Sequence, residues 1–168
     1  MTFEKLIRLG GTAAICSGIA DIIGIFILFI ALYISAIPGI ASVVFLMAGN
    51  VLLAFALMGI YGCQFEKTGY LGLTGFVFAL SGLLLGMARF FTPLGWGLYL
   101  IGILTLVVAN YESKIIPSIG LWLWFAGVAI SLGTGIAGMK ILSYLGTLIS
   151  GAARTWIGMS LRRKIEKT

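Results

Sequence analysis

Three polar residues stand inside long apolar segments of the chain: Asp21, Asn50 and Arg154. An ionisable side chain near the centre of a lipid bilayer is costly, and it is usually partnered or functional. We therefore expect Asp21 to be buried and paired, with Arg154 as a charged partner or Asn50 as a neutral one. Two roles stay open for this group: a proton, cation or substrate site, or a hydrogen-bonded cluster with a structural role only.

The remaining residues offer little material for catalysis. The chain contains no histidine, which excludes His-ligated haem, His-based zinc proteases and serine–histidine mechanisms. Apart from Asp21, the carboxylates lie at the ends of apolar segments: Glu4, Glu66, Glu112 and Glu166. Paired-carboxylate catalysis and acidic metal clusters therefore lack their residues. We expect a non-enzymatic protein with no catalytic residue, no metal site and no cofactor.

The composition indicates that lipid is the solvent around this chain. Of its 168 residues, 61% are hydrophobic and 10% are charged, whereas soluble domains carry about 25% charged residues. Glycine occupies 24 positions, about twice its average share of ~7%, and most glycines lie inside the apolar segments. Because small residues let membrane helices approach closely, the composition predicts an all-α bundle of transmembrane helices.

Six segments of the chain are candidates for membrane spans. A helix needs about 20 apolar residues to cross the ~30 Å hydrocarbon core. Prolines, polar pairs and charges divide the single membrane domain, residues 1–168, into spans at 9–34, 40–63, 70–91, 94–109, 115–137 and 141–161. The polar stretches 64–69 and 110–114 are expected to be loops.

The basic residues favour one orientation of these spans. With the N-terminus inside, the inner segments hold Lys5, Arg8, Lys67, Lys114, Arg162, Arg163, Lys164 and Lys167, whereas the outer loops hold Arg89 and Lys140. Cytoplasmic loops carry an excess of Lys and Arg, so we expect both termini in the cytoplasm and the chain in a bacterial plasma membrane. The same distribution argues against a nucleic-acid partner, which needs a basic face on a soluble fold.

One predicted helix carries a regular stripe of small residues. Gly72, Gly75, Ala79, Gly82 and Gly86 recur at spacings of three and four, which places them on one helical face. We expect this seam to pack against another helix of the same chain; oligomerisation or docking to another subunit is the alternative. Similar stripes in the first and fifth spans predict a thin bundle with little room for a large internal cavity.

Short motifs in three places carry a family resemblance. They are Arg8-Leu9-Gly10-Gly11, Phe65-Glu66-Lys67-Thr68-Gly69-Tyr70-Leu71-Gly72, and Trp156-Ile157-Gly158 followed by Leu161-Arg162-Arg163. These motifs resemble pieces of small uncharacterised bacterial polytopic membrane proteins, and the resemblance implies no activity. The length, basic charge and small-residue stripes are also similar to those of substrate-binding components of energy-coupling vitamin transporters. Against this second resemblance, the outer loops are short and apolar and offer few polar contacts for a ligand.

Two functions follow as expectations. The abundant packing seams favour a membrane subunit or scaffold that works through helix–helix contact, with the lipid bilayer and other membrane subunits, or itself, as partners. The polar residues at depth favour a small transporter or ligand-binding component that uses Asp21, Asn50 and Arg154. The sequence is silent on the ligand of such a component.

Overall fold

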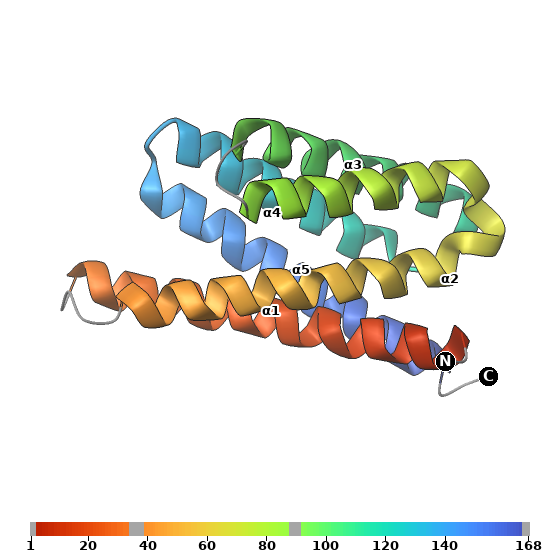
Figure 1. Cartoon of the computed structure of the whole chain (residues 1–168). Coiled ribbons are helices and arrows are strands. Elements are labelled where there is room, and N and C mark those ends of the chain that lie inside the picture. The colour runs from red at the N-terminus through yellow and green to blue at the C-terminus, as the bar shows by residue number, and fades with distance from the viewer. Residues whose placement is uncertain (1–2, 34–38, 88–91, 166–168) are drawn as a thin grey trace.

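The computed structural model describes residues 3–33, 39–87 and 92–165. Within these residues the chain forms five helices, α1 (Phe3–Tyr33), α2 (Gly39–Met87), α3 (Thr92–Ser113), α4 (Ser118–Ile136) and α5 (Lys140–Ile165). Figure 1 shows the helices lying side by side along one direction. The expected all-helical bundle is therefore confirmed, whereas a set of six separate helices is not.

The number of separate helices is five rather than six because the polar stretch 64–69 is not a loop. The helical backbone runs on to Thr68 and is interrupted at Gly69 alone, where φ is 49° and ψ is −130°. A residue with a side chain rarely adopts these angles, so a glycine is needed there. Figure 1 shows α2 doubling back at this point, with its two halves, 39–68 and 70–87, side by side.

Other expected helix boundaries also move. The stretch 110–113 is the last turn of α3 rather than a loop, and α4 begins at Ser118, with Pro117 before it instead of inside its first turn. The helices α1 and α5 extend several residues beyond the apolar segments, to Phe3 and Ile165, because a helix continues into water where the residues favour it. The expected span ends at positions 34 and 91, and Arg89, lie outside the described residues.

In the part of the chain that the structure describes, four helical stretches are long and apolar enough to cross a membrane: Glu4–Ala31, Ile40–Met87, Pro93–Tyr111 and Ser118–Ile136. The helix α5 is not among them. Its polar residues Ser150 and Arg154 are buried, while Ile141, Leu145 and Ile149 are exposed on its outer face. The low hydropathy of α5 thus comes in part from polar residues that face inward, whereas its outer face carries apolar side chains.

Glycines set the closest helix contacts. The helix α1 packs between the first half of α2 and α5, the second half of α2 packs on α3, and α4 packs on α5. Close approaches of two glycines include Gly10 with Gly59, Gly18 with Gly151, Gly82 with Gly95, and Gly127 with Gly146. Each pair brings two backbones together at a distance that no β-carbon would allow.

The stripe of small residues lies mainly against α3. Gly72, Gly75, Ala79, Gly82 and Gly86 are all buried. A β-carbon on Gly75 would lie 3.0 Å from the backbone nitrogen of Leu106, and one on Gly82 would lie 2.6 Å from the carbonyl oxygen of Gly95. Gly72 differs, because a β-carbon there would meet only Thr68 of its own helix. The seam thus faces a helix of the same chain.

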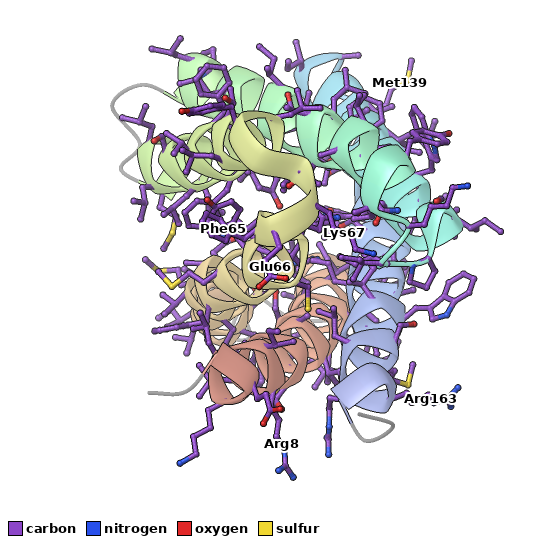
Figure 2. The ribbon with its side chains drawn as sticks, turned by 90° about the vertical axis from the view of Figure 1, so that its right-hand side faces the viewer. Arg8, Phe65, Glu66, Lys67, Met139 and Arg163 are labelled. Atoms are coloured by element: carbon purple, nitrogen blue, oxygen red, sulfur yellow. The ribbon has the colours of Figure 1, made fainter. Side chains whose placement is uncertain are left out.

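The bundle has one end rich in charge. The start of α1, the Gly69 bend and the end of α5 lie at this end (Figure 1), which we call the terminal end; the opposite end is the far end. Figure 2 looks onto the terminal end, where Arg8 and Arg163 point away from the helices and Glu66 and Lys67 lie at the bend.

Candidate functional site

Asp21 and Arg154 form a buried ion pair in the middle of the bundle. The Asp21 carboxylate accepts a hydrogen bond from Nη2 of Arg154, and the side chains are 11% and 3% exposed. Asp21 lies close to the midpoint of α1, so the pair is distant from both ends of the bundle. A pair of charges at this depth is tolerated because each neutralises the other and further hydrogen bonds satisfy the remaining groups.

Two serines, one turn from the charged residues, complete the guanidinium contacts. Nη1 of Arg154 donates to Oγ of Ser17 at 2.7 Å, and Nε donates to the carbonyl oxygen of Ser150 at 3.2 Å. Arg154 thus uses three of its five N–H groups on described residues. Charge-assisted hydrogen bonds of this kind hold the side chain in one orientation.

The Asp21 carboxylate also depends on a glycine opposite it. A β-carbon added to Gly49 of α2 would overlap Oδ1 of Asp21. The missing side chain at Gly49 therefore provides the space that the carboxylate occupies. The pair, which we call the Asp21–Arg154 pair, is in this way enclosed by α1, α2 and α5.

A cavity of about 250 Å³ adjoins the pair. Its polar lining comes from four helices and comprises Asp21, Asn50, Ser131, Thr147, Ser150 and Arg154; the aromatic residues Trp96 and Tyr99 of α3 complete the ring of helices. The sequence predicts little room for a large internal cavity, and this cavity is small. Glycine contacts hold the helices close together elsewhere in the bundle. Beside the pair, Trp96 and Tyr99 of α3 and the polar side chains border the space that remains.

Asn50, the third candidate of the sequence analysis, lines this cavity without joining the ion pair. It is half-buried, and among the described residues it makes no hydrogen bond. Its amide therefore keeps both its donor and its acceptor capacity for something else in the cavity.

Four hydroxyl groups form a connected row along one side of the cavity. They belong to Ser131, Ser143, Thr147 and Ser150, and all but Ser143 line the cavity. Ser131 Oγ lies 2.9 Å from Thr147 Oγ1, and the Ser143 hydroxyl donates to the carbonyl oxygen of Ser131 at 2.9 Å. Ser150 Oγ donates to the carbonyl oxygen of Thr147 at 3.0 Å. Three members of this hydroxyl row follow α5 from near its start to the guanidinium, and Ser131 joins them from α4. The polar surface thus extends from the pair toward the far end.

Toward the terminal end the cavity is closed by apolar side chains. Five fully buried residues, all 0% exposed, form this apolar floor: Leu57, Ile103, Leu106, Leu121 and Ile157. Four of them come after a cavity-lining residue of their helix, and Leu121 comes before the lining residues of α4, in each case on the side of the terminal end. The core next to the cavity on this side is therefore apolar.

A second buried polar cluster lies between the apolar floor and the terminal end, and it was not predicted from the sequence. Asn110 accepts a hydrogen bond from Gln64 Nε2 at 3.2 Å and from the backbone nitrogen of Ile116 at 3.0 Å, and its amide donates to the carbonyl oxygen of Ile116 at 2.8 Å. These bonds tie α2 to the turn between α3 and α4. The cluster fixes backbone positions and lines none of the cavity, so we assign it a structural role.

The spacing in the sequence carries a signal for both serines. Ser17 precedes Asp21 by four residues, and Ser150 precedes Arg154 by four. Residues at this spacing share a helix face, so each charge has a hydroxyl beside it. The contribution of Tyr99, by contrast, depends on how α3 packs and has no such signal.

The groups around the cavity can form hydrogen bonds of both kinds with a bound molecule. The carboxylate accepts hydrogen bonds, the guanidinium donates them, and the amide and hydroxyls do both. Such a set suits a small polar or zwitterionic solute. Comparison of the chain with models of known protein families, with curated protein sequences and with solved structures finds no match.

Proposed function

We propose that this chain is a non-enzymatic integral membrane protein that binds a small polar solute in the cavity above the Asp21–Arg154 pair. The observation that carries this proposal is a 250 Å³ cavity with a charged, hydrogen-bonding lining inside an otherwise apolar bundle. Ligand pockets in proteins usually measure about 300–1,000 Å³, so the solute is small. A vitamin-sized ligand is too large, and the resemblance to vitamin-transporter components does not extend to the ligand.

The proposal includes six membrane spans with both termini in the cytoplasm. The division of α2 at Gly69 supports two spans in place of one 49-residue helix, and α5 runs alongside α1 with an apolar outer face. The terminal end carries Lys5, Arg8, Lys67 and Arg163, an excess of basic residues that favours the cytoplasmic side, here of a bacterial plasma membrane. The cavity then lies on the outer half, and its solute enters from outside.

The orientation is tested by cysteine labelling in intact cells. In a chain whose native Cys16 and Cys63 are replaced by alanine, we expect Met139→Cys to react with a membrane-impermeant maleimide. We expect Lys67→Cys to react only after the membrane is permeabilised, because Met139 and Lys67 lie near opposite ends of the bundle. Reaction of Lys67→Cys in intact cells would overturn the orientation.

Solute binding is tested by thermal unfolding of the purified protein in mild detergent. Glycine, acetate, methylammonium and acetamide serve as zwitterionic, anionic, cationic and neutral probes. A ligand that binds only the folded state raises Tm with its concentration, so we expect at least one probe to raise Tm. The expectation fails if none of the four does so at any concentration.

A matched pair of variants locates the binding. Thr147→Val removes a hydroxyl from the cavity wall, and Thr105→Val removes one from α3 outside the cavity; both hydroxyls donate to the carbonyl four residues earlier. We expect Thr147→Val and Asn50→Leu to reduce the rise in Tm by several-fold and Thr105→Val to leave it unchanged. An equal reduction in Thr105→Val would place the solute elsewhere.

A subunit or scaffold role is the second candidate, but the packing seams no longer favour it. The seams that suggested helix–helix contact are occupied by helices of this same chain, as Gly18 against Gly151 and Gly82 against Gly95 illustrate. Exposed apolar side chains still cover the outside of the bundle, and they suit lipid or a partner helix equally. Native electrophoresis in mild detergent separates the two: a large stable assembly supports the scaffold, and a single protomer stabilised by a probe supports solute binding.

A further inference from the structure

A groove lies between α1 and the first half of α2, outside the cavity and near the terminal end. It encloses about 590 Å³, within the range of ligand sites in proteins. Its lining changes along its length: Lys5, Arg8 and Thr12 come first, and Cys16 of α1 with Leu52 and Phe55 of α2 form the deeper, apolar part. The groove is therefore basic where it begins and apolar where it ends.

The basic residues of this groove are available to a ligand. Lys5 and Arg8 are exposed, and among the described residues neither forms an ion pair with a carboxylate. Figure 2 shows Arg8 directed away from the helices at the terminal end. Unpaired cations at the boundary of a membrane attract anionic headgroups.

The length of the groove matches one leaflet of a bilayer. Lys5 and Cys16 are eleven residues apart on α1, which corresponds to about 16 Å along a helix. Half of the ~30 Å hydrocarbon core is about 15 Å. A lipid whose headgroup lies at Lys5 and Arg8 can therefore extend an acyl chain to the deep end of the groove beside Cys16. The whole lipid then lies within one leaflet.

We propose that this groove binds one anionic phospholipid, whose phosphate lies against Lys5 and Arg8 and whose acyl chain lies between α1 and α2. The apolar part excludes a free phosphate or a soluble anion as the intended ligand, since neither would cover Leu52 and Phe55. The two cations select against zwitterionic lipids. This site is separate from the solute cavity and does not depend on it.

Native mass spectrometry of the full chain tests the proposal. The delipidated protein is mixed with equal amounts of phosphatidylglycerol and phosphatidylcholine that carry the same acyl chains. We expect one phosphatidylglycerol molecule to bind preferentially, and we expect the variant with Lys5→Gln and Arg8→Gln to lose this preference by on the order of tenfold. The preference should persist with Lys67→Gln and Arg163→Gln, which remove two charges from the same end but away from the groove.

A second variant tests the apolar part. Cys16→Trp fills the deep end of the groove at an exposed position, so we expect the protein to stay folded and to bind less of both lipids. Equal binding of the two lipids to the unaltered protein would overturn the proposal. So would an equal loss of preference in the Lys67→Gln, Arg163→Gln control, because the charge of the whole end, rather than the groove, would then select the lipid.

Discussion

Asp21→Asn is expected to lower the free energy of unfolding by about 3–5 kcal/mol, the cost of leaving one charge of a buried pair without its partner. The guanidinium of Arg154 has no neutral form under folding conditions, and its side chain is 3% exposed. Arg154→Gln should cost less, because an aspartic acid has a neutral form and Arg154 does not. Unfolding by SDS titration in detergent micelles measures both changes.

The double variant separates a structural pair from a binding site. Asp21→Asn combined with Arg154→Gln leaves no buried charge, so it should recover much of the stability that Asp21→Asn loses. Arg163→Gln, an exposed basic residue on the same helix, should change stability by less than about 0.5 kcal/mol. If the double variant recovers stability but no longer shows the Tm rise with a probe, the pair serves binding. A double variant as unstable as the worse single variant would contradict direct pairing.

The helical class could be predicted because composition and segment length constrain it strongly. The segments end where the sequence places prolines and charges, but the bends between helices depend on single backbone positions. Gly69 reverses the chain without a loop. The sequence marks the polar stretch 64–69 as a break between spans, but not the single residue at which the helix bends. The last turn of α3 was likewise expected as a loop because Asn110 is polar, whereas its polar groups are satisfied inside the protein.

The candidate site could be predicted in part because buried charge is rare in an apolar chain. Asp21 and Arg154 stand out by type alone, and an unpaired charge at this depth is too costly to persist. The cavity beside them has no such signature. It exists because Tyr99 and Trp96 of α3 face α1 and α5 across a gap lined by Thr147 and Asn50, and that arrangement follows from helix packing rather than from any local pattern.

The position of the pair suggests why the bundle needs so many glycines. An ion pair in lipid has no water to share its hydrogen bonds, so neighbouring helices must come close enough to supply them. Gly18 brings α1 against Gly151 of α5, one turn from the residues that form the pair. Gly49 leaves space for the carboxylate. The small residues thus set the distance at which the polar groups meet.

Gly82→Ala is expected to lower the free energy of unfolding by about 1–3 kcal/mol, the usual cost of overpacking a core. The added β-carbon would overlap the backbone of Tyr99 and lie 2.6 Å from the carbonyl oxygen of Gly95. Neither group is a flexible side chain, so α2 and α3 must move apart to accommodate it. Gly82→Leu should cost more, because a longer side chain separates the helices further.

Gly97 provides the matched control for this variant. It lies on α3, the helix that Gly82 contacts, and a β-carbon there would meet nothing within 4 Å. Gly97→Ala should therefore leave stability unchanged or raise it by up to about 1 kcal/mol, the difference in helix propensity between glycine and alanine. Leu84→Ala, on the exposed face of the same helix as Gly82, should also have little effect. If Gly82→Ala unfolds at the same SDS concentration as Gly97→Ala, the seam does not hold α2 against α3.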